Sequence, residues 1–216
     1  MGTWSDNGLY IVGKDQLDER KATIFAYQSV SEKKDNNNLY DRYKLNTDRK
    51  REVVVCGKLA EQAFTVFARE FLDIELVVNY EIYQGESNVD NNDFSINGYN
   101  VDVKASRDTQ VRGINKCVET FNFPVPTDQT IKDITVEVIY DNQIRNFYIA
   151  KWIDKFTYET NATTGTFFLE SGKRQPFYKL SLKYGYSVTE LKRIADSTRR
   201  LEEYARRLKN IGGQRI

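Results

Sequence analysis

The feature that most constrains the fold is the dipeptide Asn97-Gly98, which lies between two runs of alternating apolar and polar residues. An Asn-Gly pair in that setting is the strongest short-range indication of a β-hairpin with a two-residue turn. Paired positions across such a hairpin sum to a constant, so Asp93 faces Asp102. The sequence therefore predicts a hairpin over residues 92–104 in which two aspartates are cross-strand partners.

The alternation of side chains along a strand distributes the hairpin residues over two faces. Lys104 falls on the face of Asp102, whereas Phe94, Val101 and Val103 point into a core. Like charges directly opposite each other destabilise a sheet by about 0.2–1 kcal/mol, so a purely structural hairpin gains nothing from facing aspartates. A divalent cation held between the carboxylates would reverse the sign of that effect.

Two alternatives to this cation site remain open. Asp90 is a second candidate for the acid of the first strand, but it would point to the opposite face if the strand extends that far, which favours Asp93. The other alternative is a solvated hairpin in which Asp102 and Lys104 merely pair, because short Asp-x-Lys patterns are common. The segments on either side of the hairpin weigh against this second alternative.

These flanking segments predict one helix and three further strands. Apolar residues recur at helical spacing over residues 57–72, with Glu61 at the margin of the apolar face. Residues Ile74–Tyr83 are rich in β-branched and aromatic side chains and predict a strand directly after this helix. Downstream of the hairpin, Ile134–Tyr140 and Asn146–Ile153 predict two more strands.

The composition restricts the chemistry that the chain can perform. The sequence of 216 residues has no histidine, which excludes Ser-His-Asp triads, Cys-His dyads and histidine zinc sites and leaves carboxylates, Lys and Tyr. Cys56 and Cys117 are too few for a metal cluster or a disulfide framework, so we expect buried thiols. The net charge of +1 excludes a uniformly basic surface, so any nucleic-acid contact must be a local patch.

The N-terminal part of the chain carries little functional information. No run approaches the roughly 18 apolar residues of a membrane span and the start lacks a signal-peptide pattern, so we expect a cytoplasmic protein without membrane contact. Residues Gly8–Asp15 have the spacing of a phosphate loop. However, Asp15 replaces the hydroxyl residue that holds magnesium and Leu9–Val12 predicts a strand, so we expect no nucleotide cofactor. The charged, Asn-rich residues 32–38 predict an exposed loop.

The order of these features resembles the PD-(D/E)XK nuclease superfamily, which includes many type II restriction endonucleases. The resemblance rests on Glu61 in a helix, followed by a strand, Asp93, a hairpin and the run Asp102–Lys104, and it covers residues 57–153. Asn92 stands where the family name implies proline. The resemblance implies an α/β, restriction-endonuclease-like core, in which a central mixed β-sheet is flanked by helices and the site lies at the hairpin.

The resemblance also implies roles for individual residues. Asp93 and Asp102 would be ligands of Mg²⁺, with the backbone carbonyl of Val103 as a further ligand. Glu61 would complete the acidic cluster directly or through water, and Lys104 would orient the attacking water and stabilise its deprotonated form. Carboxylate oxygens suit Mg²⁺, which agrees with this assignment. The implied reaction is hydrolysis of a phosphodiester bond in double-stranded DNA.

Two groups of basic residues are candidates for contacts with the DNA backbone. One group follows the hairpin directly, and the other recurs every seven residues along a predicted C-terminal helix over residues 188–211, which a capping box at Ser187–Glu190 introduces. The candidates are Arg107, Arg112, Lys116, Lys192, Arg199 and Arg206. An ordinary solvated surface is the alternative for both groups.

The sequence thus predicts one domain with four parts: an N-terminal region (1–56), a nuclease core (57–153), a β-hairpin addition (154–187) and a C-terminal helix (188–211). We expect a Mg²⁺-dependent type II restriction endonuclease that acts as a homodimer, since two copies related by a two-fold axis cut both strands. A structure-selective repair or junction-resolving nuclease of the same fold is one alternative. A non-catalytic nucleic-acid or protein interaction module is the other.

Overall fold

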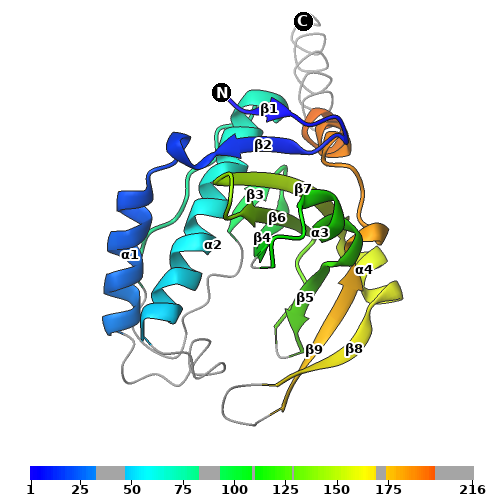
Figure 1. Ribbon diagram of the computed structural model, residues 1–216. Coiled ribbons are helices and arrows are strands. Elements are labelled where there is room, and N and C mark those ends of the chain that lie inside the picture. The colour runs from blue at the N-terminus through cyan, green and yellow to red at the C-terminus, as the bar shows by residue number, and fades with distance from the viewer. Residues whose placement is uncertain (33–46, 83–92, 109, 128, 169–173, 198–216) are drawn as a thin grey trace, which may run out of the picture.

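The protein, seen in a computed structural model, is a mixed α/β structure with two sheets (Figure 1). The structure describes residues 1–32, 47–82, 93–108, 110–127, 129–168 and 174–197. Its α-helices are α1 (Glu19–Glu32), α2 (Thr47–Phe67), α3 (Ile114–Thr120) and α4 (Lys155–Asn161) among these residues, and α2 continues into the π-helical turn η3 (Ala68–Leu72). Short 3-10 turns are η1 (Lys14–Gln16), η4 (Leu182–Tyr184) and η5 (Val188–Glu190).

The large sheet has six strands in the spatial order β1 (Thr3–Trp4), β2 (Tyr10–Gly13), β7 (Asn146–Asp154), β6 (Ile134–Asp141), β4 (Tyr99–Asp108) and β3 (Phe94–Ile96). Strands β4 and β6 pair in parallel, and the other neighbours pair antiparallel. The small sheet is antiparallel, in the order β5 (Asn122–Pro126), β9 (Arg174–Ser181) and β8 (Thr163–Phe168).

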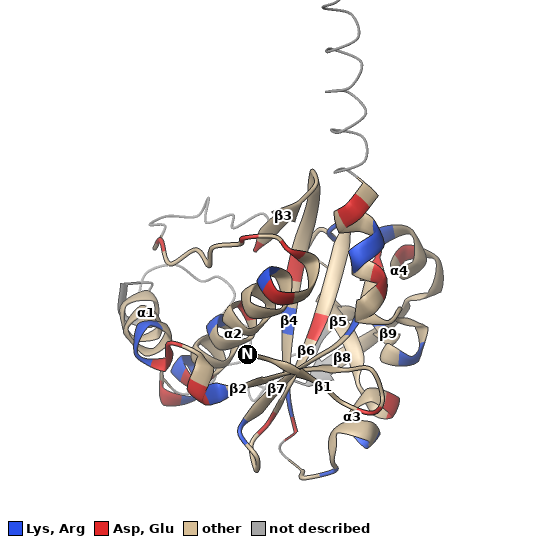
Figure 2. Ribbon diagram, turned by 90° about the horizontal axis from the view of Figure 1, so that it is seen from above, with Lys and Arg blue, Asp and Glu red and all other residues tan. Residues whose placement is uncertain are grey.

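The large sheet is covered on both faces (Figure 2). Helix α2 packs Leu59, Phe64 and Phe67 against one face, and we call this cluster the helix-side core. The small sheet and α4 cover the other face through a second cluster that includes Phe123 and Tyr158, which we call the small-sheet core. Burial on both faces is what a parallel strand pair such as β4 and β6 requires, because its residues then pack against apolar partners on each side.

The hairpin has the predicted turn and register. Asn97 and Gly98 have φ angles of 55° and 84°, the left-handed pair that a two-residue turn of this type needs. Phe94 pairs with Val101 and Ile96 with Tyr99, as the sum rule requires. Phe94, Val101 and Val103 belong to the helix-side core, which confirms the predicted core face of the hairpin.

Asn97 also ties the hairpin to the C-terminal part of the described chain. Its amide donates hydrogen bonds to the carbonyls of Ile194 (2.8 Å) and Ala195 (3.0 Å). We expect Asn97→Ala to lower the free energy of unfolding by about 1–3 kcal/mol, through two lost hydrogen bonds and a residue less suited to positive φ. Urea denaturation measures this, with Asn100→Ala on the exposed side of the same hairpin as the control. Equal stability of the two variants would contradict the expectation.

Several other sequence predictions are confirmed. The helix over residues 57–72 ends where expected, β6 and β7 match the two predicted downstream strands, and β2 forms where the phosphate-loop spacing occurs. Cys56 and Cys117 are buried free thiols. No helix in the described part of the chain is long and apolar enough to cross a membrane.

The predicted strand over Ile74–Tyr83 is wrong for residues 74–82, which form no strand. The segment is nevertheless half-buried in alternation: Ile74, Leu76 and Val78 face the helix-side core, whereas Val77 is 84% exposed. The alternating pattern therefore reports contact with the core and not a ladder of backbone hydrogen bonds, because a strand also needs a paired neighbour. Residue 83 lies outside the described residues.

The predicted boundary between an N-terminal region and the core at residue 56 is also wrong. Helix α2 begins at Thr47, so the boundary falls inside a helix, and β1 and β2 belong to the large sheet. Residues 154–187 do contain a β-hairpin, formed by β8 and β9, but they also contain α4, and β5 completes the small sheet.

The C-terminal helix is described only in part. Ser187 caps η5 by accepting a hydrogen bond from the Thr189 amide, and residues 191–197 are helical. Leu191 and Ala195 belong to the helix-side core, so the start of this helix packs on the domain itself. Residues 198–211 of the predicted helix lie outside the described residues.

Candidate active site

Strand β4 brings Asp102 and Lys104 together. The Lys104 Nζ lies 2.7 Å from Asp102 Oδ2, and the two side chains are 26% and 18% exposed. Val101 and Val103 point to the helix-side core, so the alternation of the strand places the ion pair on the opposite face, toward the small sheet. The predicted common face of Asp102 and Lys104 is confirmed, and the pair remains partly open to solvent.

Asp93 lies directly before β3 and binds the edge of β4. Its amide donates a hydrogen bond to the Val101 carbonyl (3.0 Å), and its Oδ2 accepts one from the Val103 amide (2.6 Å). The carboxylate thus occupies the position at which a longer β3 would have continued the ladder. The predicted register holds as far as the Phe94–Val101 pair. Beyond it the Asp93 amide also bonds to the Val101 carbonyl, so the predicted ladder pair of Asp93 with Asp102 is not formed.

The pKa of Asp93 is affected by the charges of the other three predicted catalytic residues, Glu61, Asp102 and Lys104. Burial raises the pKa of Asp93 well above its usual range, the carboxylates of Glu61 and Asp102 raise it further, and the Val103 amide and Lys104 oppose the shift. Asp93 therefore lies within electrostatic reach of all three charged partners. Its negative form is unfavourable in this setting until further positive charge is brought close.

Lys104 has the opposite balance. Burial disfavours its charged form, but the attraction of Asp102 and the hydrogen bond to it, together with Asp93 and Glu137, outweigh burial and raise the pKa of Lys104. Lys104 is therefore an ammonium group at neutral pH, held at the site by acids on two strands. A fixed positive charge of this kind can stabilise negative charge that develops on a bound group.

Glu61 reaches this region from the other side of the sheet. It is 8% exposed on α2, and its carboxylate lies 2.7 Å from the Lys58 ammonium in an i,i+3 pair. The described residues contain no group of three or more Cys, Asp or Glu side chains close enough to hold a metal together. The direct version of the predicted acidic cluster is therefore not formed in this structure, whereas a link from Glu61 through water stays a prediction.

Two charged neighbours of the site were missed from the sequence. The sequence does contain a signal for each of them. Lys58 lies three positions before Glu61 in the predicted helix, and Glu137 is a single acid within the apolar strand ITVEVIY. Glu137 is paired in register with Lys104 and is fully buried. Burial raises its pKa to about 8, although Ser106 and Lys104 act in the opposite direction.

The donor atoms near the hairpin suit a hard divalent cation. Asp93 and Asp102 offer carboxylate oxygens, and nearby Asp93 carries negative charge only at a cost that a cation would remove. Oxygen ligands of this kind are preferred by Mg²⁺, which also keeps several water molecules and so needs few protein ligands. The predicted ligand set therefore fits the chemistry of the site. Val103, the predicted backbone ligand, lies between Asp102 and Lys104 in β4, and its amide binds the Asp93 carboxylate.

The predicted DNA-contacting residues do not form one surface in the described residues. Arg107 lies on the helix side of β4, where it pairs with Glu52 (3.3 Å), so it lies on the face of the strand opposite Asp102. Lys116 pairs with Glu119 on α3, and Lys192 pairs with Asp196. Arg112 donates hydrogen bonds to the side chain of Gln110.

Four predicted residues lie beyond the part of the chain that the structure describes. These are Asp90, Asn92, Arg199 and Arg206. The two hydrogen bonds of Asp93 to β4 support the preference for Asp93 over Asp90.

Comparisons with models of protein families, with curated proteins and with solved structures found no significant match to this chain. The fold and the site define a mixed α/β protein with a carboxylate and lysine site at a β-hairpin, and any function must be argued from that site.

Proposed function

We propose that the protein is a Mg²⁺-dependent endonuclease that hydrolyses phosphodiester bonds of double-stranded DNA. The observation that carries the proposal is the Asp102–Lys104 ion pair, 2.7 Å long and partly exposed, beside the half-buried carboxylate of Asp93. Two acids and an ammonium at one hairpin match the donor set and the fixed charge that phosphodiester hydrolysis requires. The resemblance to the PD-(D/E)XK superfamily implies the same function for these residues.

Each residue of the site has a role in this proposal. Asp93 and Asp102 would hold Mg²⁺, together with the Val103 carbonyl, and a bound Mg²⁺ would supply positive charge for the phosphate and for the attacking water. Lys104 orients the water and stabilises negative charge on it. Glu61, held by Lys58, would take part through water.

The restriction type and the homodimer belong to the same proposal. A palindromic duplex site is cut on both strands most simply by two copies related by a two-fold axis. A repair or junction-resolving nuclease of the same fold would use the same catalytic residues but would lack a base-reading surface.

The test is digestion of unmethylated phage DNA and of supercoiled plasmid by the purified protein, with Mg²⁺ or with EDTA. Discrete fragments that require Mg²⁺ support the restriction type. Random nicking, or cleavage of branched DNA alone, supports the repair alternative within the nuclease proposal. Absence of cleavage on all of these substrates with Mg²⁺ would refute the nuclease proposal and leave a non-catalytic interaction module.

A further inference from the structure

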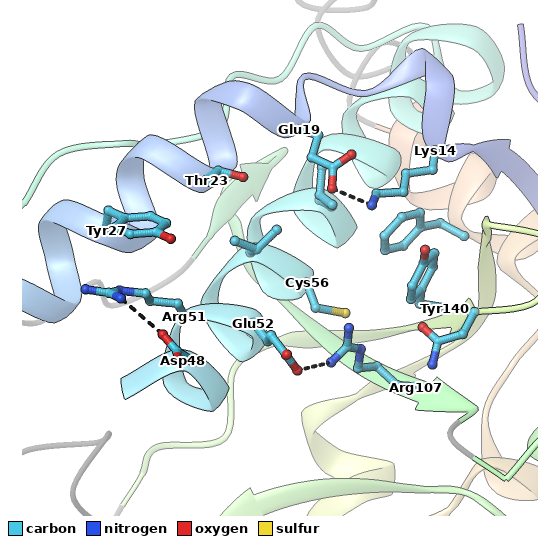
Figure 3. Close-up of a pocket in the computed structure, with 14 residues that line it drawn as sticks. Lys14, Glu19, Thr23, Tyr27, Asp48, Arg51, Glu52, Cys56, Arg107 and Tyr140 are labelled. Atoms are coloured by element: carbon cyan, nitrogen blue, oxygen red, sulfur yellow. Dashed lines mark hydrogen bonds and ion pairs between the residues drawn. The ribbon is translucent and has the colours of Figure 1, made fainter. Parts of the chain in front are cut away.

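A cavity of about 410 Å³ lies on the helix side of the large sheet (Figure 3). Its walls come from η1, α1 and α2 and from the ends of β4, β6 and β7. Arg107 of β4 enters it from the face opposite Asp102 and Lys104, so the cavity is separate from the candidate active site. Cavities of this size accommodate small organic ligands.

In the ion pairs that line this cavity, the basic side chains are more buried than their acidic partners. Three ion pairs line it: Lys14–Glu19, Arg51–Asp48 and Arg107–Glu52. The cations are 15%, 24% and 24% exposed, whereas their acids are 48%, 88% and 53% exposed. Ion pairs with such exposed acids contribute little to stability, so the acids can give way to an anion that enters.

The guanidinium groups are not saturated by their acids. The Nε atoms of Arg51 and Arg107 are buried and have no hydrogen-bond partner in the structure. Lys14 and Arg107 both lie close enough to the Cys56 thiol to affect its pKa. Burial raises the pKa of Cys56 to about 11, and the positive charges of both side chains oppose that shift. The cavity therefore concentrates positive charge between Lys14 and Arg107, where a phosphate would be bound by charge-assisted hydrogen bonds.

The cavity also has flat surfaces. The Arg51 guanidinium lies over the Tyr27 ring, 4.1 Å from its centroid, and Figure 3 shows this pair on the side away from Lys14. Tyr140 and Phe147 stack with ring centroids 4.5 Å apart and form another part of the lining. Guanidinium and aromatic planes are the surfaces on which a nucleic-acid base stacks.

We propose that this cavity binds a nucleoside monophosphate, with the phosphate between Arg107 and Lys14 and the base against the Arg51–Tyr27 pair. The phosphate-loop spacing at Gly8–Asp15 plays no part through its backbone, because Tyr10–Gly13 is a strand. Only the Lys14 side chain at the end of that strand contributes. The proposal does not depend on the nuclease activity, since the two sites lie on opposite faces of β4.

Isothermal titration calorimetry with deoxyadenosine 5′-monophosphate tests the proposal, in EDTA and without DNA. We expect saturable binding of one equivalent, and binding at least about tenfold weaker for both deoxyadenosine and inorganic phosphate, since each supplies only half of the contacts. Absence of binding would overturn the proposal. Equal affinity for the nucleotide and for phosphate would exclude the base from the site, and equal affinity for deoxyadenosine would exclude the phosphate; either result also overturns it.

Two substitutions with opposite expected signs separate a binding role from a structural one. Arg107→Gln should weaken nucleotide binding about tenfold or more, through the lost charge-assisted hydrogen bonds. Glu52→Gln should strengthen it several-fold, because Arg107 is then released from its acid. Arg69→Gln, at an exposed arginine outside the cavity, should leave it unchanged. Weaker binding by both Arg107→Gln and Glu52→Gln would indicate a structural role alone and would overturn the proposal.

Discussion

Lys104→Ala and Asp102→Asn are expected to lower the rate of Mg²⁺-dependent DNA cleavage by about a hundredfold or more each. Lys104→Ala removes the ammonium that stabilises negative charge at the site, and Asp102→Asn removes a carboxylate of the proposed ligand set while keeping its size. Both residues belong to one ion pair, so the double variant should lose little beyond either single one. Single-turnover cleavage of a labelled duplex measures the rates.

The matched control for this experiment is Lys155→Ala. Lys155 is a half-exposed lysine of α4 that pairs only loosely with Glu159, at 3.8 Å, and its replacement should leave the cleavage rate unchanged. Circular dichroism and the urea midpoint establish that each variant is folded, because loss of one partner leaves the other charge partly buried. Cleavage by folded Lys104→Ala at the rate of the unmodified protein would rule out the proposed mechanism.

Glu137→Gln is expected to stabilise the protein at pH 8 by on the order of 2–4 kcal/mol. The folded-state pKa of Glu137 is about 8, above the usual value of 4.5, because the carboxyl group is fully buried. Between these two values the unfolded chain releases the proton while the folded protein keeps it, so this group makes stability fall as pH rises from about 4.5 to 8. Glutamine has the shape of the protonated acid and removes that dependence.

Urea denaturation at pH 5 and pH 8 measures this difference. The advantage of Glu137→Gln should be large at pH 8 and small at pH 5, because pH 5 lies only slightly above the usual value of 4.5 and the unfolded chain then gains little by releasing the proton. Glu119→Gln, at an exposed glutamate of α3, should show no such pH dependence. A Glu137→Gln variant that is less stable at both pH values would mean that the carboxylate is ionised and held by Lys104 in the folded protein.

The part of the site that could be predicted from the sequence is the part built from one hairpin. Asn97 and Gly98 specify the turn, the turn specifies the register as far as the Phe94–Val101 pair, and the alternation of β4 places Lys104 beside Asp102. All of these relations connect residues within about a dozen positions. Residues 57–67 of helix α2 and strands β6 and β7 were likewise visible in the periodicity of their own residues.

The errors share a different cause. Residues 74–82 have the composition of a strand, but no neighbouring strand pairs with them, and pairing is a property of two segments. The boundary at residue 56 failed because the polar first turns of α2 carry no apolar periodicity. Glu137 was missed because its importance arises from Lys104 in the neighbouring strand, which is 33 positions away in sequence, and from the layer that buries it.

The sequence alone therefore determined which side chains share a face of the hairpin, since the geometry of a two-residue turn and the two-residue repeat of a strand are local and leave one arrangement. Only the tertiary structure decided what lies around that hairpin. It placed Glu61 on the far side of the sheet, buried Glu137 beside Lys104, and assembled a cavity lined by Lys14, Arg51, Arg107 and their acidic partners. These relations depend on which surfaces bury apolar area against each other, and that is a property of the whole packed chain.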